Sequence, residues 1–220
     1  MVIEPKVKGF ICTTAHPTGC EKNVYSQIEY VKSKGNVNGA KKVLVIGAST
    51  GYGLASRITA AFGMQAATIG VLFDKEASGK RTATPGLYNT RAFDQAAKQA
   101  GLYSCSINGD AFSKEIKQQV IDTIKKDLGK VDLVIYSLAS PRRTTEDGTT
   151  YVSALKTVGE AFTQKNWNLR DNTVTDATIN PATQEEIDAT IKVMGGEDWK
   201  DWLEELVKAD AIEDHALTIA

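Results

Sequence analysis

The stretch KKVLVIGASTGYG, residues 41–53, decides the fold of this 220-residue chain. Residues 43–46 are aliphatic, which predicts a strand buried on both faces of a parallel sheet. Apolar residues recur at helical spacing just after the turn, so a helix should begin there and point its positive end at the turn. Backbone N–H groups at such an end can hold a pyrophosphate. The stretch predicts a dinucleotide phosphate cradle, formed by Gly47, Ala48, Ser49, Thr50, Gly51, Tyr52 and Gly53.

The three glycines of this turn have different expected roles. Gly47 permits a tight exit from the strand, Gly51 lets the backbone approach the phosphates, and Gly53 lets helix and strand pack closely. A glycine-rich turn between any strand and helix gives the same letters, so the neighbouring sequence has to support the assignment.

A carboxylate follows the next predicted strand, which covers residues 67–73. Asp74 stands about twenty residues beyond Gly53, where an acid accepts both hydroxyls of an adenosine ribose. The alternative is a solvated acid at the end of a strand. The Asp74 charge would repel the ribose phosphate of NADPH, and Lys75 beside it would offset part of that repulsion. NADH is therefore expected in preference to NADPH.

Two further strand exits complete the predicted site. The strand at 102–107 leads to Asp110 and Ala111, where an acid can accept from the adenine amino group and a small residue leaves room for the ring. Alternatively, Asp110 or Ser113 caps a helix predicted at 114–128, and both roles can hold. The strand at 131–136 ends in SLASP, which is small enough for a nicotinamide ribose to approach the backbone. No GxSxG elbow surrounds its serines, so a hydrolase is not indicated.

Composition excludes several classes of protein. The formal net charge is −1 and the apolar content is average, which indicates a folded α/β domain and argues against disorder or nucleic-acid binding. No apolar run reaches membrane-spanning length, and the N-terminus MVIEPKVKGF does not resemble a signal peptide. We expect a cytoplasmic protein that binds no nucleic acid and inserts into no membrane.

The cysteines do not indicate a disulfide framework or a metal site. Cys12, Cys20 and Cys105 form an odd set, which favours reduced thiols. Cys12, His16 and Cys20 are evenly spaced, but they lack a CxxC pair and a clear fourth ligand, and Pro17 is expected to interrupt any helix that would align them. No metal is expected, and His16 is expected to order a loop.

The order of predicted elements indicates an α/β fold, a Rossmann-like doubly wound parallel sheet. One domain is expected over residues 1–220, with an N-terminal extension and an inserted lid. Trp199 and Trp202 are expected to be packing anchors, with a role in lining the substrate site as the alternative, and His215 is expected to lie in a loop. The expected parts are the extension at 1–40 (a strand at 7–13, a helix at 21–33), the cofactor-binding core at 41–141 (with a helix at 89–100), the lid at 142–182, and a final part at 183–220 (helices at 183–193 and 198–209, a strand from 216).

Five stretches together resemble the trans-2-enoyl-CoA reductase family, which includes the type V enoyl-acyl-carrier-protein (ACP) reductases. They are GFICTTAHPTGC, VLVIGASTGYGLASRITAAFG, INGDAFS, DLVIYSLASPRR and VMGGEDW. The resemblance implies an NADH-dependent oxidoreductase that reduces the C=C bond of trans-2-enoyl thioesters, enoyl-CoA or enoyl-ACP, in fatty acid biosynthesis or related lipid metabolism. It also implies that the residues 47–53 hold the pyrophosphate, Phe73 and Asp74 the adenosine ribose, Asp110 and Ala111 the adenine, and Leu138 and Ala139 the nicotinamide side.

The family pattern carries its catalytic Tyr and Lys after a TIA-like strand, and this sequence ends at Ala220. The resemblance therefore implies no catalytic residue in the chain, which would be a cofactor-binding part that is inactive alone. Tyr151 and Lys156 have the wrong spacing for this pair and are expected in a loop. An unfinished sheet would favour a separate C-terminal part or self-association. The alternatives are a short-chain reductase of a ketone or alcohol and a non-catalytic NAD-binding protein.

Overall fold

The computed structural model describes residues 3–8 and 11–220, and the chain divides into two compact units. Unit 1 comprises Met1–Leu138 and Asp201–Ala220, and unit 2 comprises Ala139–Lys200. The predicted division into extension, core, lid and final part stays a prediction.

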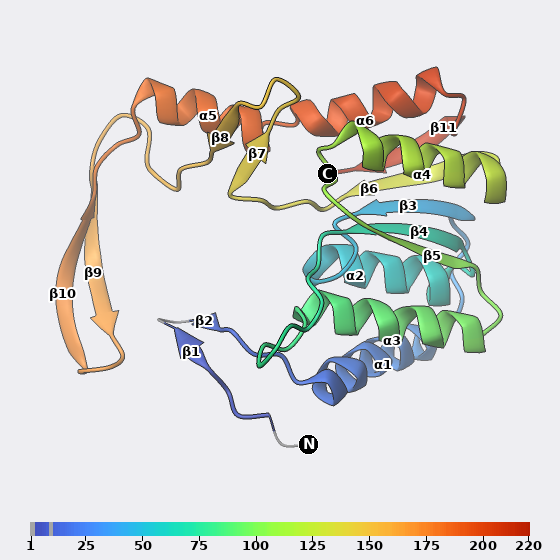
Figure 1. Ribbon diagram of the computed structural model, residues 1–220, viewed down its shortest axis with the longest axis horizontal. Coiled ribbons are helices and arrows are strands. Elements are labelled where there is room, and N and C mark those ends of the chain that lie inside the picture. Colours follow the sequence, from blue (N-terminus) through green and yellow to red (C-terminus); the bar gives the residue numbers. More distant parts are fainter. Residues whose placement is uncertain (1–2, 9–10) are drawn as a thin grey trace. The chain divides into compact units, whose positions relative to one another are not determined.

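A five-stranded parallel sheet forms the centre of unit 1 (Figure 1). Among the strands of this sheet, the one that comes first in the chain lies in the middle, and later strands are added on either side of it, so the sheet is doubly wound. The predicted Rossmann-like fold class is confirmed. The strands, in their spatial order, are β11 (Ile212–Ile219), β6 (Val131–Tyr136), β3 (Lys42–Ile46), β4 (Ala67–Leu72) and β5 (Ser104–Asn108).

Helices cover both faces of this sheet, as Figure 1 shows. Because successive side chains of a strand point to opposite faces, Leu44 and Ile46 join a buried cluster with α4 (Lys114–Asp127) and α6 (Glu197–Lys208). Val43 and Val45 pack on the other side, against the π-helix η1 (Thr59–Gly63) that continues α2 (Gly51–Ile58). On that side α1 (Pro17–Ser33) and α3 (Pro85–Gln99) close a second cluster around the edge-on pair Phe62 and Phe93.

The N-terminal segment differs from its prediction. Instead of one strand at 7–13, the chain forms two short antiparallel strands, β1 (Val7–Lys8) and β2 (Ile11–Cys12), and the predicted residues 9–10 lie outside the described part. Helix α1 begins at Pro17, not at residue 21. Proline is well suited to a first turn because its missing N–H has no helical partner there, and the His16 side chain caps the turn by accepting from the Gly19 amide at 3.1 Å.

Two other predictions fail at the boundaries of elements. Helix α3 begins at Pro85, one turn before the predicted residue 89. His215 lies within β11, not in a loop, because this strand starts at Ile212 and its pairing with β6 shifts register between Ile212 and Leu217. An exposed edge strand accepts polar residues, which explains why EDH looks like a loop in the sequence.

Unit 2 consists of two antiparallel hairpins and helical segments. Tyr151 belongs to a strand and pairs with Arg143, so its predicted loop position is wrong, whereas Lys156 does lie in a loop. The hairpin of residues 162–179 exposes most of its side chains. The elements are β7 (Arg142–Thr144), β8 (Thr150–Val152), β9 (Phe162–Asn168), β10 (Thr173–Ile179), α5 (Gln184–Met194) and the first residues of α6.

Candidate dinucleotide site

The carboxyl ends of the central strands are joined directly by backbone hydrogen bonds. Parallel strands end at the same edge of a sheet, so the segments that follow them converge. The Gly47 amide donates to the Val71 carbonyl at 3.0 Å. The Gly109 amide donates to the Leu72 carbonyl, and the Ser137 amide donates to the Ile46 carbonyl, each at 2.8 Å.

The glycine turn has a geometry that side chains would disrupt. Gly47 has φ +85°, and a Cβ there would lie 2.3 Å from the Ser137 carbonyl oxygen. A Cβ on Gly53 would lie 2.0 Å from the Gly47 carbonyl oxygen, so helix α2 packs closely on the end of β3. Gly51 has φ +54° and faces open space. Thr50 is the extended residue before α2, and the Tyr52 side chain is 88% exposed.

A buried cation lies beneath this turn. Arg57 of α2 is fully buried and approaches the space beside Gly70 together with Ala48, which is itself buried. It donates to Ser106 Oγ at 2.8 Å and Thr68 Oγ1 at 3.2 Å. Burial lowers the pKa of Arg57 to about 10, and the charge of Asp94, 3.5 Å away, opposes that shift. Arg57 stays charged at neutral pH and ties α2 to β4 and β5.

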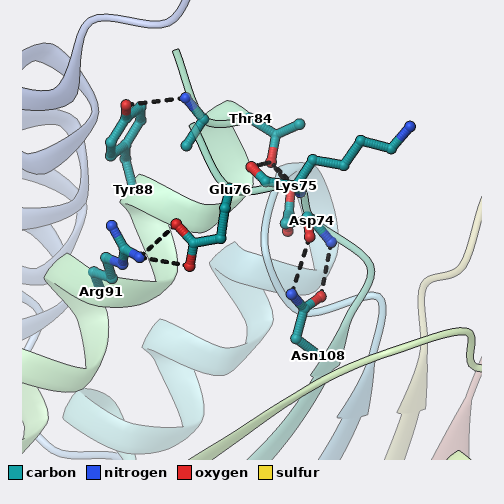
Figure 2. A network of polar contacts seen from close by, with 8 residues as sticks. Asp74, Lys75, Glu76, Thr84, Tyr88, Arg91 and Asn108 are labelled. Carbon is teal, nitrogen blue, oxygen red and sulfur yellow. Dashed lines mark hydrogen bonds and ion pairs between the residues drawn. The ribbon is translucent and has the colours of Figure 1, made fainter. Parts of the chain in front are cut away.

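Asp74 lies at the centre of a polar network after β4 (Figure 2). Its backbone amide donates to Asn108 Oδ1 at 2.8 Å, and Asn108 Nδ2 donates to its carbonyl at 2.9 Å. The carboxylate Oδ1 accepts from the Thr84 hydroxyl at 2.7 Å. Oδ2 is buried and has no hydrogen-bond partner among the described residues. A buried acceptor without a donor is costly, so this atom is suited to a ligand hydroxyl.

Helix α3 holds the loop that follows Asp74. The Tyr88 hydroxyl accepts from the Ala83 amide at 3.1 Å, and Arg91 Nη2 binds both carboxylate oxygens of Glu76 at 2.7 and 2.8 Å. Figure 2 shows both links from α3 to the loop. The Glu76 and Arg91 side chains are exposed, so their ion pair adds little stability but fixes a geometry.

The other predicted residues have varied surroundings. The Phe73 side chain is 71% exposed. Asp110 is half-buried and caps the Phe112 amide at 3.0 Å, while Ser113 caps α4 through the Ile116 amide. Ala111 is buried in the core, and its carbonyl accepts from the Trp202 indole at 3.1 Å, which confirms Trp202 as a packing anchor. Leu138 is half-buried, and Ala139, the first residue of unit 2, is exposed.

Sequence reasoning missed the contribution of α3. Thr84 contacts Asp74, and Asn89 Nδ2 donates to the Ser49 carbonyl of the glycine turn at 3.0 Å. Gly86 lies so close that a Cβ there would come within 2.5 Å of both Asp74 carboxylate oxygens and Ser49 Oγ. The sequence Thr84-Pro85 contains a signal for this helix start, since threonine is common before a helix and proline at its first position.

The described residues show little sign of a metal site or of a membrane-spanning helix. Within residues 3–8 and 11–220 no group of three or more His, Cys, Asp or Glu side chains is arranged to hold a metal ion. Cys12, Cys20 and Cys105 are free thiols, and burial raises the pKa of Cys105. No helix of the described residues has the length and apolar character needed to cross a membrane.

The sheet order and its glycine turn define the class as a Rossmann-like α/β protein, in which dinucleotides bind at the edge described above. The protein-family model for the trans-2-enoyl-CoA reductase catalytic region matches residues 81–220 of the sequence. The family model for the NAD(P)H binding domain of trans-2-enoyl-CoA reductase matches residues 2–79. The chain belongs to the trans-2-enoyl-CoA reductase family.

Individual relatives agree with this assignment. A trans-2-enoyl-CoA reductase [NADH] of Ruminiclostridium cellulolyticum and an enoyl-[acyl-carrier-protein] reductase [NADH] of Cytophaga hutchinsonii are each 58% identical over the whole chain. The crystal structure of Treponema denticola trans-2-enoyl-CoA reductase in complex with NAD is similar with a TM-score of 0.93 and 51% identity, over 99% of this chain. The chain spans 56% of the length of each of these three proteins.

Proposed function

We propose that this chain forms the NADH-binding part of a reductase that acts on the C=C bond of trans-2-enoyl thioesters. The observation that carries the proposal is the buried Asp74 Oδ2, which lacks a hydrogen-bond donor within the described part of the chain and lies beside the glycine turn. Two of the similar proteins are named as NADH-dependent reductases, one of enoyl-CoA and one of enoyl-ACP, and this supports the same cofactor and thioester substrates here.

The residues of the site fit a dinucleotide. The open space at Gly51 admits a pyrophosphate beside the first N–H groups of α2. Asp74 Oδ2 would accept a ribose hydroxyl, and the exposed Phe73 offers an aromatic face next to it. In this proposal the turn residues 47–53 hold the pyrophosphate, Asp110 and Ala111 the adenine, and Leu138 and Ala139 the nicotinamide side.

When bound at this site, NADH would supply a hydride for the β-carbon of the enoyl thioester. The described residues bind and orient it, since the converging strand exits fix the backbone that would surround it. Reduction leaves negative charge on the thioester oxygen and needs a proton at the α-carbon, tasks suited to a tyrosine hydroxyl beside a cation. It stays a prediction that such a Tyr and Lys lie outside these 220 residues. The lid role of residues 142–182 and a cytoplasmic location are predictions as well.

Two variants of matched shape that differ by one negative charge test cofactor binding directly. Gly51→Asp places a carboxylate where the pyrophosphate is expected, and Gly51→Asn has nearly the same shape and tolerance of the left-handed backbone without the charge. We expect NADH, followed by its fluorescence during titration, to bind the Asp variant about tenfold more weakly than the Asn variant. Equal affinities, or a wild-type chain that does not bind NADH, would contradict the proposal.

Turnover separates the thioester reaction from its alternatives. The chain is incubated with NADH and crotonyl-CoA, and in parallel with simple ketones. We expect no NADH oxidation above background from these 220 residues, and oxidation with crotonyl-CoA once a C-terminal part of a relative is added. Oxidation with ketones alone would favour an ordinary short-chain reductase, and turnover by the chain alone would contradict the prediction that the catalytic pair lies elsewhere.

A further inference from the structure

The two oxygens of the Asp74 carboxylate have different surroundings. Oδ1 accepts a 2.7 Å hydrogen bond from the Thr84 hydroxyl. Oδ2 is buried and has no donor in the part of the chain that the structure describes. One oxygen is therefore held by the protein, and the other is left for a ligand.

Thr84 occupies the position before α3 where a side chain usually caps the helix. Its hydroxyl makes no such bond within this fully described helix. Instead it accepts from the Lys75 amide at 3.0 Å, while the Thr84 amide donates to the Lys75 carbonyl at 3.0 Å. The Thr84 hydroxyl has one proton to donate, and it has two acceptors in reach. Asp74 Oδ1 lies 2.7 Å from the Thr84 hydroxyl oxygen and the Lys75 carbonyl oxygen lies 3.4 Å from it, so the stronger hydrogen bond is to Asp74.

Other contacts prevent Asp74 from moving away. Asn108 fixes its backbone through two hydrogen bonds of 2.8 and 2.9 Å. The carboxylate also packs against Gly86, where a Cβ would come within 2.5 Å of both oxygens. The Lys75 side chain runs away from the carboxylate in Figure 2. The negative charge is therefore held in one place from β5 and from the start of α3.

We propose that Thr84 is a positioning residue that makes the cofactor site selective for NADH over NADPH. The inference rests on the proposed binding of NADH at this site. By holding Oδ1, Thr84 leaves Oδ2 to accept the ribose hydroxyl of NADH. In NADPH a phosphate replaces that hydroxyl, and the Asp74 carboxylate would repel it. The carboxylate cannot rotate away while its Oδ1 stays hydrogen-bonded to Thr84.

The test compares the affinities of the full chain for NADH and NADPH, both measured by fluorescence titration. Thr84→Val keeps the shape of the side chain and removes the hydroxyl, whereas Thr84→Ser keeps the hydroxyl. We expect Val to lower the ratio of NADH to NADPH affinity about tenfold, the size of one hydrogen bond to a charged group, and Ser to preserve it. Thr123→Val, which removes a hydroxyl from the exposed face of α4, should leave the ratio unchanged.

A double-mutant comparison shows whether Thr84 acts through Asp74. Asp74→Ala should abolish most of the selectivity, and adding Thr84→Val to it should change the ratio no further. A Val variant that weakens both cofactors equally would show a merely structural role and overturn the inference, as would additive effects of the two substitutions. If the wild-type chain binds NADH but its selectivity does not depend on Thr84, only this inference fails; if it binds neither cofactor, the proposed function fails as well.

Discussion

At the scale of single residues, the glycine turn gives the sharpest stability prediction. A Cβ at Gly53 would lie 2.0 Å from the Gly47 carbonyl oxygen, so Gly53→Ala must force α2 away from β3. We expect a loss of at least roughly 1–3 kcal/mol in the free energy of unfolding, measured by denaturant titration. The matched control is Gly19→Ala in α1, where the nearest atom to a new Cβ is 3.5 Å away. This control should lose no stability, since Gly19 lies in a helical turn where alanine fits without a clash. A neutral Gly53→Ala would contradict the observed packing.

Residues also differ in how far the sequence predicts them. Gly47, Gly51 and Gly53 can be recognised in the sequence, because their backbone positions require glycine and their spacing is typical of a dinucleotide-binding turn. Thr84 is not, since its contact with Asp74 depends on how the intervening loop folds back. The same holds for Arg57, whose partners on β4 and β5 come together only in the folded sheet.

At the scale of elements, helix α5 has a cap that depends on pH. Thr183 and Glu186 form a reciprocal capping box, and the Lys156 ammonium also donates to the Glu186 carboxylate. This bond, followed by the one from the Thr183 amide, holds the pKa of Glu186 below its usual value of 4.5. A lowered acid pKa means that the carboxylate stabilises the fold above about pH 4.5, and that this contribution is lost as the pH falls through the folded-state pKa.

We therefore expect Glu186→Gln to flatten the loss of stability between neutral and acid pH. The glutamine retains an acceptor but does not titrate. Thermal unfolding midpoints from pH 7 to pH 3 check this, with Glu185→Gln as a control that removes a charge from the same turn. The expectation fails if the unfolding midpoints of wild type and Glu186→Gln fall by the same amount between pH 7 and pH 3.

The elements themselves were largely predictable, and their boundaries were not. The central strands follow from apolar runs between turns, and β6 has the predicted bounds. The sequence pattern predicts the helix only from residue 89, because the signal at its true start is a single Thr-Pro pair, whose proline ring suits a first helical turn. The extent of β11 was missed because its polar residues lie on an exposed edge, where burial imposes no alternation.

At the scale of the whole molecule, β11 is a terminal strand of the sheet order and pairs with β6. Leu217 and Ile219 on this strand are 67% and 56% exposed, and an edge with apolar side chains is a template for association. We expect the 220-residue chain to self-associate through this strand, with the dissociation constant measured by analytical ultracentrifugation.

Leu217→Lys should weaken this association about tenfold or more, because it removes the burial of a leucine side chain from the contact. The matched control is Val207→Lys on α6, at a valine that is 66% exposed on another element. It changes the net charge equally and should leave the dissociation constant unchanged. Equal effects of both lysines would point to general charge repulsion, and a wild-type chain that stays monomeric over the measured range would show that the edge is protected by its polar residues. Because the two substitutions carry the same charge, only a difference between them assigns the contact to β11.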